Sequence, residues 1–275
     1  MWTLSGFVDE IDADFATQCR VAAGLGLRFV EIRSAWGTNV LDLDDAQLAA
    51  VQQQLAASGL QVSSIGSPIG KIAIEDDFGP HLDRMRHAAE VAKLLGAPFV
   101  RIFSFFVAPG DDPDRHRDEV LRRMRALAEV AEQADVVLLH ENEKEIYGDV
   151  PRRCHDFLTS VGSPHLRLTW DPANFVQVGV RPFDEGYALL RPDVVYVQIK
   201  DALAADSSVV VAGAGDGQVV ETVRALRDDG FDGFFSLEPH LALAGTHGGF
   251  SGEELFTQAW RAFTDLLTAE GIAYA

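Results

Sequence analysis

The segment VVLLHENEKEIYGD, residues 136–149, begins with four apolar residues and continues at once with His140, Glu141, Asn142 and Glu143. A short run rich in Val and Leu indicates a buried strand. Charged side chains at the end of such a strand are costly unless they have partners. The same change from apolar to polar residues recurs in LRLTWDPANF (166–175), VVYVQIKDA (194–202) and GFFSLEPH (233–240). These four places need one shared explanation.

Short apolar segments alternate along the chain with longer segments of helical period, which is typical of a parallel sheet with crossover helices. The strands are expected at 2–8, 28–33, 60–66, 98–105, 135–141, 166–171, 194–201 and 233–238. The helices are expected at 12–26, 43–59, 79–96, 112–133, 150–162, 182–192, 217–230 and 252–271. Eight strand-helix pairs without a linker match the size of a (β/α)₈ barrel. We therefore predict an α/β fold, a single (β/α)₈ TIM barrel, with one domain over residues 1–275.

Composition narrows the class of partner. The formal net charge of -19 argues against nucleic acid, because binding to phosphates rests on Lys and Arg. No apolar run reaches the roughly 18 residues of a membrane span, and the N-terminus lacks a secretory pattern, so we expect a cytoplasmic protein without a membrane partner. Cys19 and Cys154 lie in predicted helices without close spacing, and we interpret both as small buried residues.

In a barrel of this kind, functional residues come from the C-terminal ends of the strands. The polar residues at these ends are Glu141, Asp171, Gln198, Lys200, Asp201, Glu238 and His240. Three carboxylates brought together repel one another unless a cation lies among them. A set of oxygen ligands suits Mg²⁺ or Mn²⁺.

Each of these residues also has an ordinary explanation. Asp171 before Pro172 could act only as a turn or cap residue, and Glu238 could merely end a strand. Glu141 and Glu143 could pair on the surface with Lys144 or Arg152. The joint occurrence at the ends of consecutive strands favours a shared site.

The motifs SGFVDEI (5–11), SIGSPIGKI (64–72), HENEKEIYGD (140–149), DPANF (171–175), QIKD (198–201) and SLEPH (236–240) occur in this order. In these motifs the chain resembles the xylose isomerase-like sugar phosphate isomerase/epimerase superfamily, which includes ketose 3-epimerases, hydroxypyruvate isomerases, inosose dehydratases and, more distantly, endonuclease IV. The resemblance implies one divalent metal held by Glu141, Asp171, position 198 and Glu238. It also implies a carbohydrate substrate and allows a homo-oligomer.

The sequence departs from the family pattern at Gln198 and at Asn174. Position 198 is Gln where the resemblance implies His, which favours Mn²⁺ or Mg²⁺ and leaves Co²⁺ or Zn²⁺ as alternatives. His240 could supply the missing imidazole if the chain stays extended after Glu238, but a position in a loop is the simpler expectation. Asn174 stands where many sugar epimerases have a His that contacts the substrate. We expect Asn174, His240 and His140 to contact substrate.

The resemblance implies that Glu141 and Glu238 carry protons to and from the carbon next to a carbonyl, while the metal stabilises the enediolate. Lys200 would either polarise the carbonyl or pair with Asp201 or Asp171. Arg101 would either bind a substrate oxygen or phosphate, or pair with Glu31. Trp36, Phe106 and Phe175 could form an apolar wall for a sugar ring, but packing in the core or at the rim is the simpler expectation for each of them alone.

These observations predict a metal-dependent isomerase or epimerase acting on a keto sugar, polyol or sugar phosphate. Two alternatives remain open: a dehydratase of the inosose type on the same site, and a sugar-binding barrel without catalysis. An abasic-site endonuclease would need a basic groove, which 42 acidic against 23 basic residues disfavour. The glycine-rich VAGAGDGQVV (211–220) lacks the third Gly of a nucleotide loop and is interpreted as a turn into the following helix.

Overall fold

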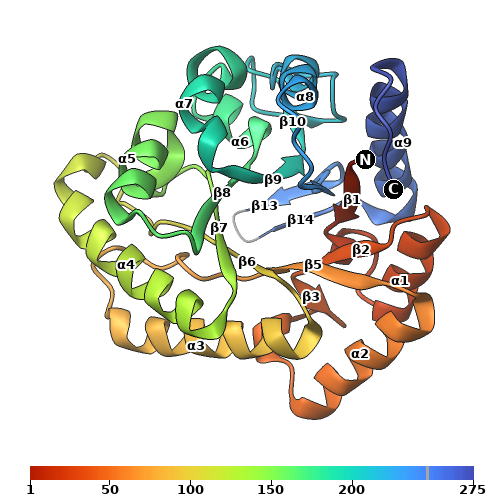
Figure 1. Ribbon diagram of the computed structural model, residues 1–275, viewed down its shortest axis with the longest axis horizontal. Coiled ribbons are helices and arrows are strands. Elements are labelled where there is room, and N and C mark those ends of the chain that lie inside the picture. The colour runs from red at the N-terminus through yellow and green to blue at the C-terminus, as the bar shows by residue number, and fades with distance from the viewer. Residues whose placement is uncertain (246–247) are drawn as a thin grey trace.

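The computed structural model describes residues 1–245 and 248–275. Eight parallel strands form a nearly closed barrel in the order β1-β12-β9-β8-β7-β6-β5-β2 (Figure 1). A bridge between Phe7 and Glu31 brings the two end strands together. The strands are β1 (Thr3–Gly6), β2 (Phe29–Ile32), β5 (Gln61–Gly66), β6 (Phe99–Ile102), β7 (Val137–Glu141), β8 (Leu166–Trp170), β9 (Val194–Ile199) and β12 (Phe234–Leu237). All eight lie within the segments that the sequence predicts, so the predicted fold is confirmed.

Helices surround the barrel (Figure 1). They are α1 (Phe15–Gly24), α2 (Asp45–Ser58), α3 (Phe78–Leu95), α4 (Arg117–Ala134), α5 (Pro151–Val161), α6 (Pro172–Gln177), α7 (Ala188–Leu190), α8 (Val219–Asp228) and α9 (Gly252–Ala269). Their ends follow local rules: α2 begins with a capping box between Asp44 and Gln47 and ends at Gly59 in the left-handed conformation. No helix formed by residues 1–245 or 248–275 is long and apolar enough to cross a membrane.

Several short elements were not predicted. The segment 182–192 forms a π-helical turn (Pro182–Tyr187) and the three residues of α7, followed by a 3₁₀ turn (Arg191–Asp193), rather than one regular helix. Further 3₁₀ turns are η1 (Val8–Glu10), η2 (Val40–Asp42), η3 (Pro113–His116) and η4 (Tyr147–Asp149). Three two-stranded hairpins lie in loops: β3 (Ser34–Ala35) with β4 (Thr38–Asn39), β10 (Asp201–Ala202) with β11 (Val209–Val210), and β13 (Leu243–Gly245) with β14 (Gly248–Phe250).

The apolar core lies mainly between the strands and the helices, where alternate strand residues such as Val197 and Ile199 join the helix side chains. Cys19 and Cys154 are buried free thiols in this region, which confirms their interpretation as small core residues. One end of the barrel interior is filled by aromatic rings with centroids 5.1 Å to 6.1 Å apart, contributed by Phe29, Phe99, Tyr196 and Phe234.

A polar layer lies next to these rings inside the barrel. Glu31 Oε2 accepts hydrogen bonds from the Tyr196 hydroxyl (3.0 Å) and the Ser236 hydroxyl (2.8 Å). The Tyr196 oxygen lies 2.9 Å from Ser63 Oγ, which lies 2.6 Å from Ser5 Oγ. Burial raises the pKa of Glu31 to about 7, although Arg101 acts in the opposite direction. This buried carboxyl makes the stability of the barrel depend on pH.

We predict that Glu31→Gln removes this pH dependence. The pKa of Glu31 rises from 4.5 to about 7 on folding, so its stabilising contribution is complete below pH 4.5 and is lost as the pH rises through 7. The free energy of unfolding of the wild type, relative to the variant, should therefore fall by about 3 kcal/mol between pH 4.5 and 8. Urea denaturation at each pH, in buffers that contain a chelator, measures the free energy of unfolding. Glu132→Gln on the exposed face of α4 is the control, and parallel pH profiles for wild type and Glu31→Gln would contradict the prediction.

Candidate functional site

Three carboxylates meet inside the barrel at the C-terminal ends of the strands. Glu141 is the last residue of β7, Asp171 follows β8, and Glu238 follows β12. One carboxylate oxygen from each lies within 4.8 Å of the others, and all three residues are at most 2% exposed. The convergence expected from the four polar strand ends is therefore present in the structure.

Three basic side chains lie among these carboxylates. Lys200 Nζ is 2.8 Å from Asp171 Oδ2 and 3.0 Å from Glu238 Oε2. Arg101 Nη1 is 2.7 Å from Glu141 Oε2, and Arg33 Nη1 is 3.2 Å from Glu238 Oε1. Arg101 thus forms ion pairs with the site carboxylates of Glu141 and Glu238 rather than with Glu31. Arg33 was not singled out in the sequence.

The expected alternative pairing of Lys200 with Asp201 is wrong. The Asp201 carboxylate accepts hydrogen bonds from the backbone N–H groups of Ala202, Gly213, Gly215 and Gly217 at 2.8 Å to 3.0 Å. The glycine-rich segment 211–220 therefore folds around Asp201, which explains the glycines without a phosphate ligand. Lys200 is left to pair with Asp171 and Glu238.

The electrostatic environment shifts the pKa values of two of these carboxyl groups, Asp171 and Glu238, in opposite directions. Burial raises the pKa of Asp171 to about 7 in spite of Lys200. Burial also acts to raise the pKa of Glu238, but Lys200, His240 and Arg33 outweigh it and hold that pKa well below its ordinary value. A group of carboxyls whose pKa values are moved in opposite directions is typical of functional sites.

Two asparagines fix the positions of these carboxylates. The Asn142 amide donates to the Asp171 carbonyl oxygen (2.8 Å) and accepts from the Asp171 N–H (3.0 Å). Asn174, in α6, donates through Nδ2 to Glu141 Oε1 (3.0 Å), and its N–H donates to Asp171 Oδ1 (2.9 Å). Asn174 therefore supports Glu141 and Asp171, and its expected contact with substrate stays a prediction. Asn142 was quoted in the sequence motif, but no role was assigned to it.

Gln198 supplies a test of whether the site fits a cation. It points into the barrel interior, is fully buried, and neither its Oε1 nor its Nε2 has a hydrogen-bond partner among the described residues. A buried amide without partners is costly. Carboxylate and amide oxygens are donor types that a hard divalent cation accepts, and the carboxylates of Glu141, Asp171 and Glu238 lie close enough together to hold one.

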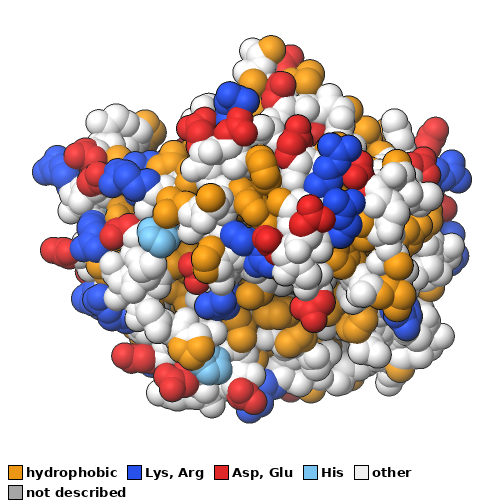
Figure 2. All heavy atoms as spheres, turned by 45° about the horizontal axis from the view of Figure 1, so that its top comes forward, with side chains coloured by type: hydrophobic (Ala, Val, Ile, Leu, Met, Phe, Trp, Pro, Cys, Tyr) orange, Lys and Arg blue, Asp and Glu red, His pale blue; other side chains and the backbone are white. Residues whose placement is uncertain are grey.

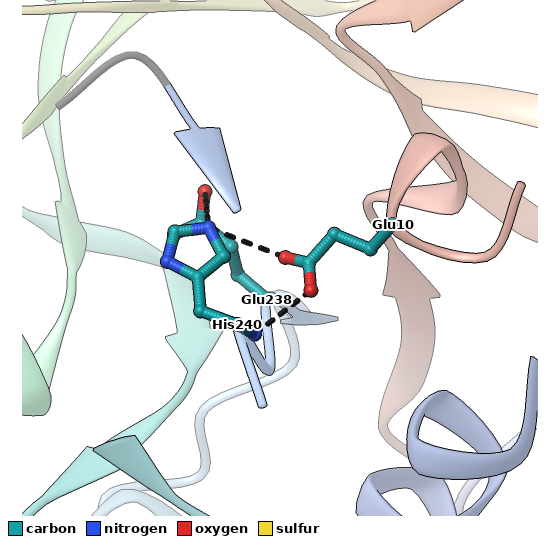
Figure 3. A group of neighbouring side chains, drawn as sticks. All are labelled: Glu10, Glu238 and His240. Carbon is teal, nitrogen blue, oxygen red and sulfur yellow. Dashed lines mark hydrogen bonds and ion pairs between the residues drawn. The ribbon is translucent and has the colours of Figure 1, made fainter. Parts of the chain in front are cut away.

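His240 lies beside Glu238 in a loop, as the simpler expectation had it, and the extended course of the chain is wrong. Its backbone has φ of 48°, so the chain turns after Glu238 instead of staying extended. His240 Nε2 is 3.4 Å from Glu238 Oε1 and 3.3 Å from Glu10 Oε1, as Figure 3 shows. Glu10, in η1, was not identified as a site residue in the sequence, although it belongs to the motif SGFVDEI.

Glu10 holds both ends of the segment that contains the hairpin β13–β14. Its Oε2 accepts from the His240 N–H and from the Ser251 hydroxyl, both at 2.8 Å. Its backbone oxygen accepts from the Ser251 N–H at 3.0 Å. Burial raises the pKa of Glu10 to about 8, against the opposing effect of Arg33.

The hairpin lies across the barrel opening (Figure 1). Arg33 Nη2 donates to the Gly249 carbonyl oxygen at 3.3 Å. A side chain at Gly249 would bring its Cβ within 1.9 Å of the His240 ring, so only glycine allows this close approach. Arg33 therefore links the hairpin to Glu238 inside the barrel.

Two expected substrate contacts lie outside this group. His140 faces the helices: its Nε2 is 2.9 Å from Ser104 Oγ and its ring lies 4.5 Å from that of Phe157. Burial lowers the pKa of His140 to about 3, so the ring is neutral. Trp36 packs edge-on against Phe15 with ring centroids 5.7 Å apart. The structure corrects the placement of His140, and a substrate contact by Trp36 stays a prediction.

Phe106 and Phe175 do not pack beside the carboxylates, in keeping with the simpler expectation of core or rim packing for each of them. Phe106 lines a separate cavity of about 390 Å³, and Phe175 packs against Trp170 in the core. The site instead contains Phe7 and Phe103. Arg101 lies over both rings, 5.0 Å and 4.7 Å from their centroids. Phe7 follows β1 and Phe103 follows β6, so the strand-end rule that identified the carboxylates could also have identified them.

The family sequence model described as xylose isomerase-like TIM barrel matches residues 19–264. A curated relative, 3-dehydroshikimate dehydratase of Bacillus anthracis, is 22% identical over 174 residues, which are 62% of this chain and 61% of that relative. The chain thus covers less than two thirds of the length of this relative.

Solved structures of similar fold include a probable 3-DHS dehydratase from Bacillus anthracis, with a TM-score of 0.77, 19% identity and coverage of 96% of this chain and 98% of that chain. D-allulose 3-epimerase from Methylomonas sp. in complex with D-allulose has a TM-score of 0.73, 16% identity and 96% coverage of both chains. A xylose isomerase-like TIM barrel protein from Mycobacterium smegmatis in complex with magnesium has a TM-score of 0.72, 19% identity and coverage of 97% and 98%. At these identities the likeness shows the fold.

We predict that Glu10→Ala detaches the segment between His240 and Ser251. Two buried donors lose their acceptor, so the free energy of unfolding should fall by about 2 kcal/mol, and the His240 amide should exchange with solvent at least ~10-fold faster. Hydrogen exchange read by mass spectrometry measures the second effect. Glu10→Gln keeps an acceptor oxygen and should stay close to the wild type. Unchanged protection of the His240 amide in Glu10→Ala would refute the role of Glu10.

Proposed function

We propose that this chain, which belongs to the xylose isomerase-like TIM barrel family, is an enzyme that removes a proton from the carbon next to a carbonyl in a polyhydroxylated substrate. The observation that supports this most directly is the buried group formed by Glu141, Asp171 and Glu238 at the C-terminal end of the barrel. Isomerisation or epimerisation of a keto sugar, polyol or sugar phosphate is the leading form of the proposal.

A divalent cation would be held by Glu141, Asp171, Glu238 and the amide oxygen of Gln198. This set contains only oxygen ligands, which supports Mg²⁺ or Mn²⁺ over Zn²⁺ or Co²⁺. The magnesium complex of the Mycobacterium smegmatis protein is consistent with this choice. When bound, the cation would act as a Lewis acid that polarises the substrate carbonyl.

Glu141 and Glu238 are the proposed proton carriers. They come from strands β7 and β12, which β8 and β9 separate, so their side chains enter the site from different sides. Arg101 and Asn174 hold both oxygens of Glu141, and Arg33 and Lys200 lie against the two oxygens of Glu238. These contacts would keep each carboxylate aimed at the substrate carbon without a rearrangement during the reaction.

Lys200 would stabilise negative charge on a substrate oxygen. Its ammonium lies between Asp171 and Glu238 and is 3% exposed, so its charge acts in a poorly screened interior. Phe7 and Phe103 would exclude water beside Arg101. The fate of the removed proton then decides the reaction: return to the opposite face gives epimerisation, and return to the neighbouring carbon gives aldose-ketose isomerisation.

Dehydration is the second candidate, favoured by the similarity to 3-dehydroshikimate dehydratase. In this reaction a carboxylate takes the proton next to the carbonyl, a carbon-carbon double bond forms, and the neighbouring carbon-oxygen bond breaks. The departing hydroxyl needs a proton to leave as water, and Lys200 is the proposed donor. A sugar-binding barrel without catalysis would bind substrate but leave its carbon-hydrogen bonds intact.

We predict that the wild type, supplied with Mn²⁺ in D₂O, introduces deuterium next to the carbonyl of D-allulose or a related neutral ketohexose, or forms water from 3-dehydroshikimate. Glu141→Gln should slow the reaction ~10²- to 10⁴-fold, because an amide cannot accept the proton. Mass spectrometry and NMR of the substrate measure the incorporation of deuterium and the rate of dehydration, in the wild type and in the variant. The control is Glu145→Gln, an exposed residue on the same loop. Full activity in Glu141→Gln would exclude Glu141 from proton transfer.

We predict that Gln198→His changes the choice of metal. Imidazole is a stronger ligand than an amide oxygen for zinc, so the affinity for Zn²⁺ relative to Mg²⁺ should rise at least ~10-fold. Calorimetric titration of the metal-free protein with each ion measures the two affinities, independently of any turnover. An unchanged Zn²⁺-to-Mg²⁺ ratio would place residue 198 outside the metal site.

A further inference from the structure

Asp9 holds Arg33 more closely than Glu238 does. Arg33 Nε donates to Asp9 Oδ2 at 2.8 Å, whereas Arg33 Nη1 lies 3.2 Å from Glu238 Oε1. Hydrogen bonds between a charged donor and a carboxylate usually measure about 2.7 to 2.9 Å. The guanidinium therefore makes its short contact with Asp9, which has no part in the proposed reaction, and a longer contact with Glu238.

Asp9 is itself fixed in position. It lies in η1, and its side chain is 9% exposed. The oxygen that Arg33 contacts, Asp9 Oδ2, also accepts a hydrogen bond from the Ser34 hydroxyl at 2.7 Å. The next residue, Glu10, holds the two ends of the hairpin segment instead. Two consecutive acidic residues thus have different partners, and the partner of Asp9 is Arg33.

The Arg33 guanidinium is enclosed on its other sides. Its central carbon lies 4.8 Å from the centroid of the Phe7 ring, and its Nη2 donates to the Gly249 oxygen at 3.3 Å. A Cβ at Gly248 would lie 2.8 Å from the same carbon. The Arg33 side chain is 7% exposed, so solvent offers little compensation for its charge. Without the Asp9 carboxylate, Glu238 would be the carboxylate left in direct contact with Arg33.

Arg33 and a divalent cation need the same group. Arg33 contacts Glu238 Oε1, while Lys200 lies against Oε2. A cation that binds Glu238 uses electron pairs that these donors also use. In the described part of the chain, Asp9 belongs to none of the groups of His and acidic side chains that lie close enough together to hold an ion. Its influence on a cation would therefore pass through Arg33.

We propose that Asp9 is a positioning residue for the cation site, which holds the Arg33 guanidinium back from Glu238 and so keeps Glu238 Oε1 available to a divalent cation. The inference rests on the proposed function, in which Glu238 is a cation ligand. It assigns to Asp9 an effect on metal affinity without making it a ligand.

Calorimetric titration of the chelator-treated protein with Mn²⁺ tests the proposal. Asp9→Asn should weaken Mn²⁺ binding at least ~10-fold, because Arg33 then pairs fully with Glu238. Arg33→Gln should bind Mn²⁺ more tightly than the wild type. In the Arg33→Gln background, Asp9→Asn should change the affinity by less than ~2-fold. A direct effect of the Asp9 charge on the cation would persist in that background, so the cycle separates the two explanations.

Two further variants control the experiment. Asp156→Asn removes the carboxylate of another Arg-Asp pair, in which Arg117 Nε donates to Asp156 Oδ2 at 2.7 Å on the helices outside the barrel, and it should bind Mn²⁺ as the wild type does. Ser34→Ala removes the second donor to Asp9 without a change of charge and should weaken Mn²⁺ binding ~2- to 5-fold. Thermal unfolding in chelator shows that each variant is folded, and Ser34→Ala carries the test if Asp9→Asn is not.

Mn²⁺ affinity that is equal in the wild type, Asp9→Asn and Ser34→Ala would overturn the proposal. An effect of Asp9→Asn that is the same with and without Arg33 would also overturn it. Glu238→Gln in the same titration separates this inference from the proposed function. Unchanged affinity in Glu238→Gln would refute the proposed cation site, whereas weaker binding in Glu238→Gln without an effect of Asp9→Asn would refute only the role of Asp9.

Discussion

The group of three buried carboxylates at the end of the barrel depends on charge compensation, because the barrel interior there is nearly closed to water. Parallel strands direct alternate side chains inward, and those that end together carry Glu141, Asp171 and Glu238 to one point. Carboxylates this close would repel one another in a medium of low dielectric constant. Arg33, Arg101 and Lys200 supply compensating charge, and each is in contact with at least one of the three. The face of the molecule in Figure 2 likewise places basic side chains beside acidic ones.

The rest of the site follows from holding these charges in place. Asn142 and Asn174 fix the backbone and side chains of two carboxylates through buried amide hydrogen bonds. Arg33 connects Glu238 to the hairpin β13–β14, and Glu10 ties the two ends of that segment to the loop after β1.

The sequence predicts the barrel because apolar runs and helical period are local signals, and it predicts the carboxylate group because strand ends share one edge. Alternation along a strand could also have placed His140, since the neighbour of an inward Glu141 must face the helices. The partners of Lys200 could not be predicted, because Asp201 is satisfied by backbone groups that return to it more than ten residues later. The role of Glu10 could not be predicted for the same reason, because its partners lie 230 and 241 residues away in the sequence.

Diffraction from a crystal soaked in Mn²⁺, with data collected at the manganese absorption edge, tests the central claim most directly. The account predicts one strong anomalous peak enclosed by Glu141, Asp171, Glu238 and the side-chain oxygen of Gln198. A saturated crystal with no peak there, or with its strongest peak elsewhere on the protein, would contradict it.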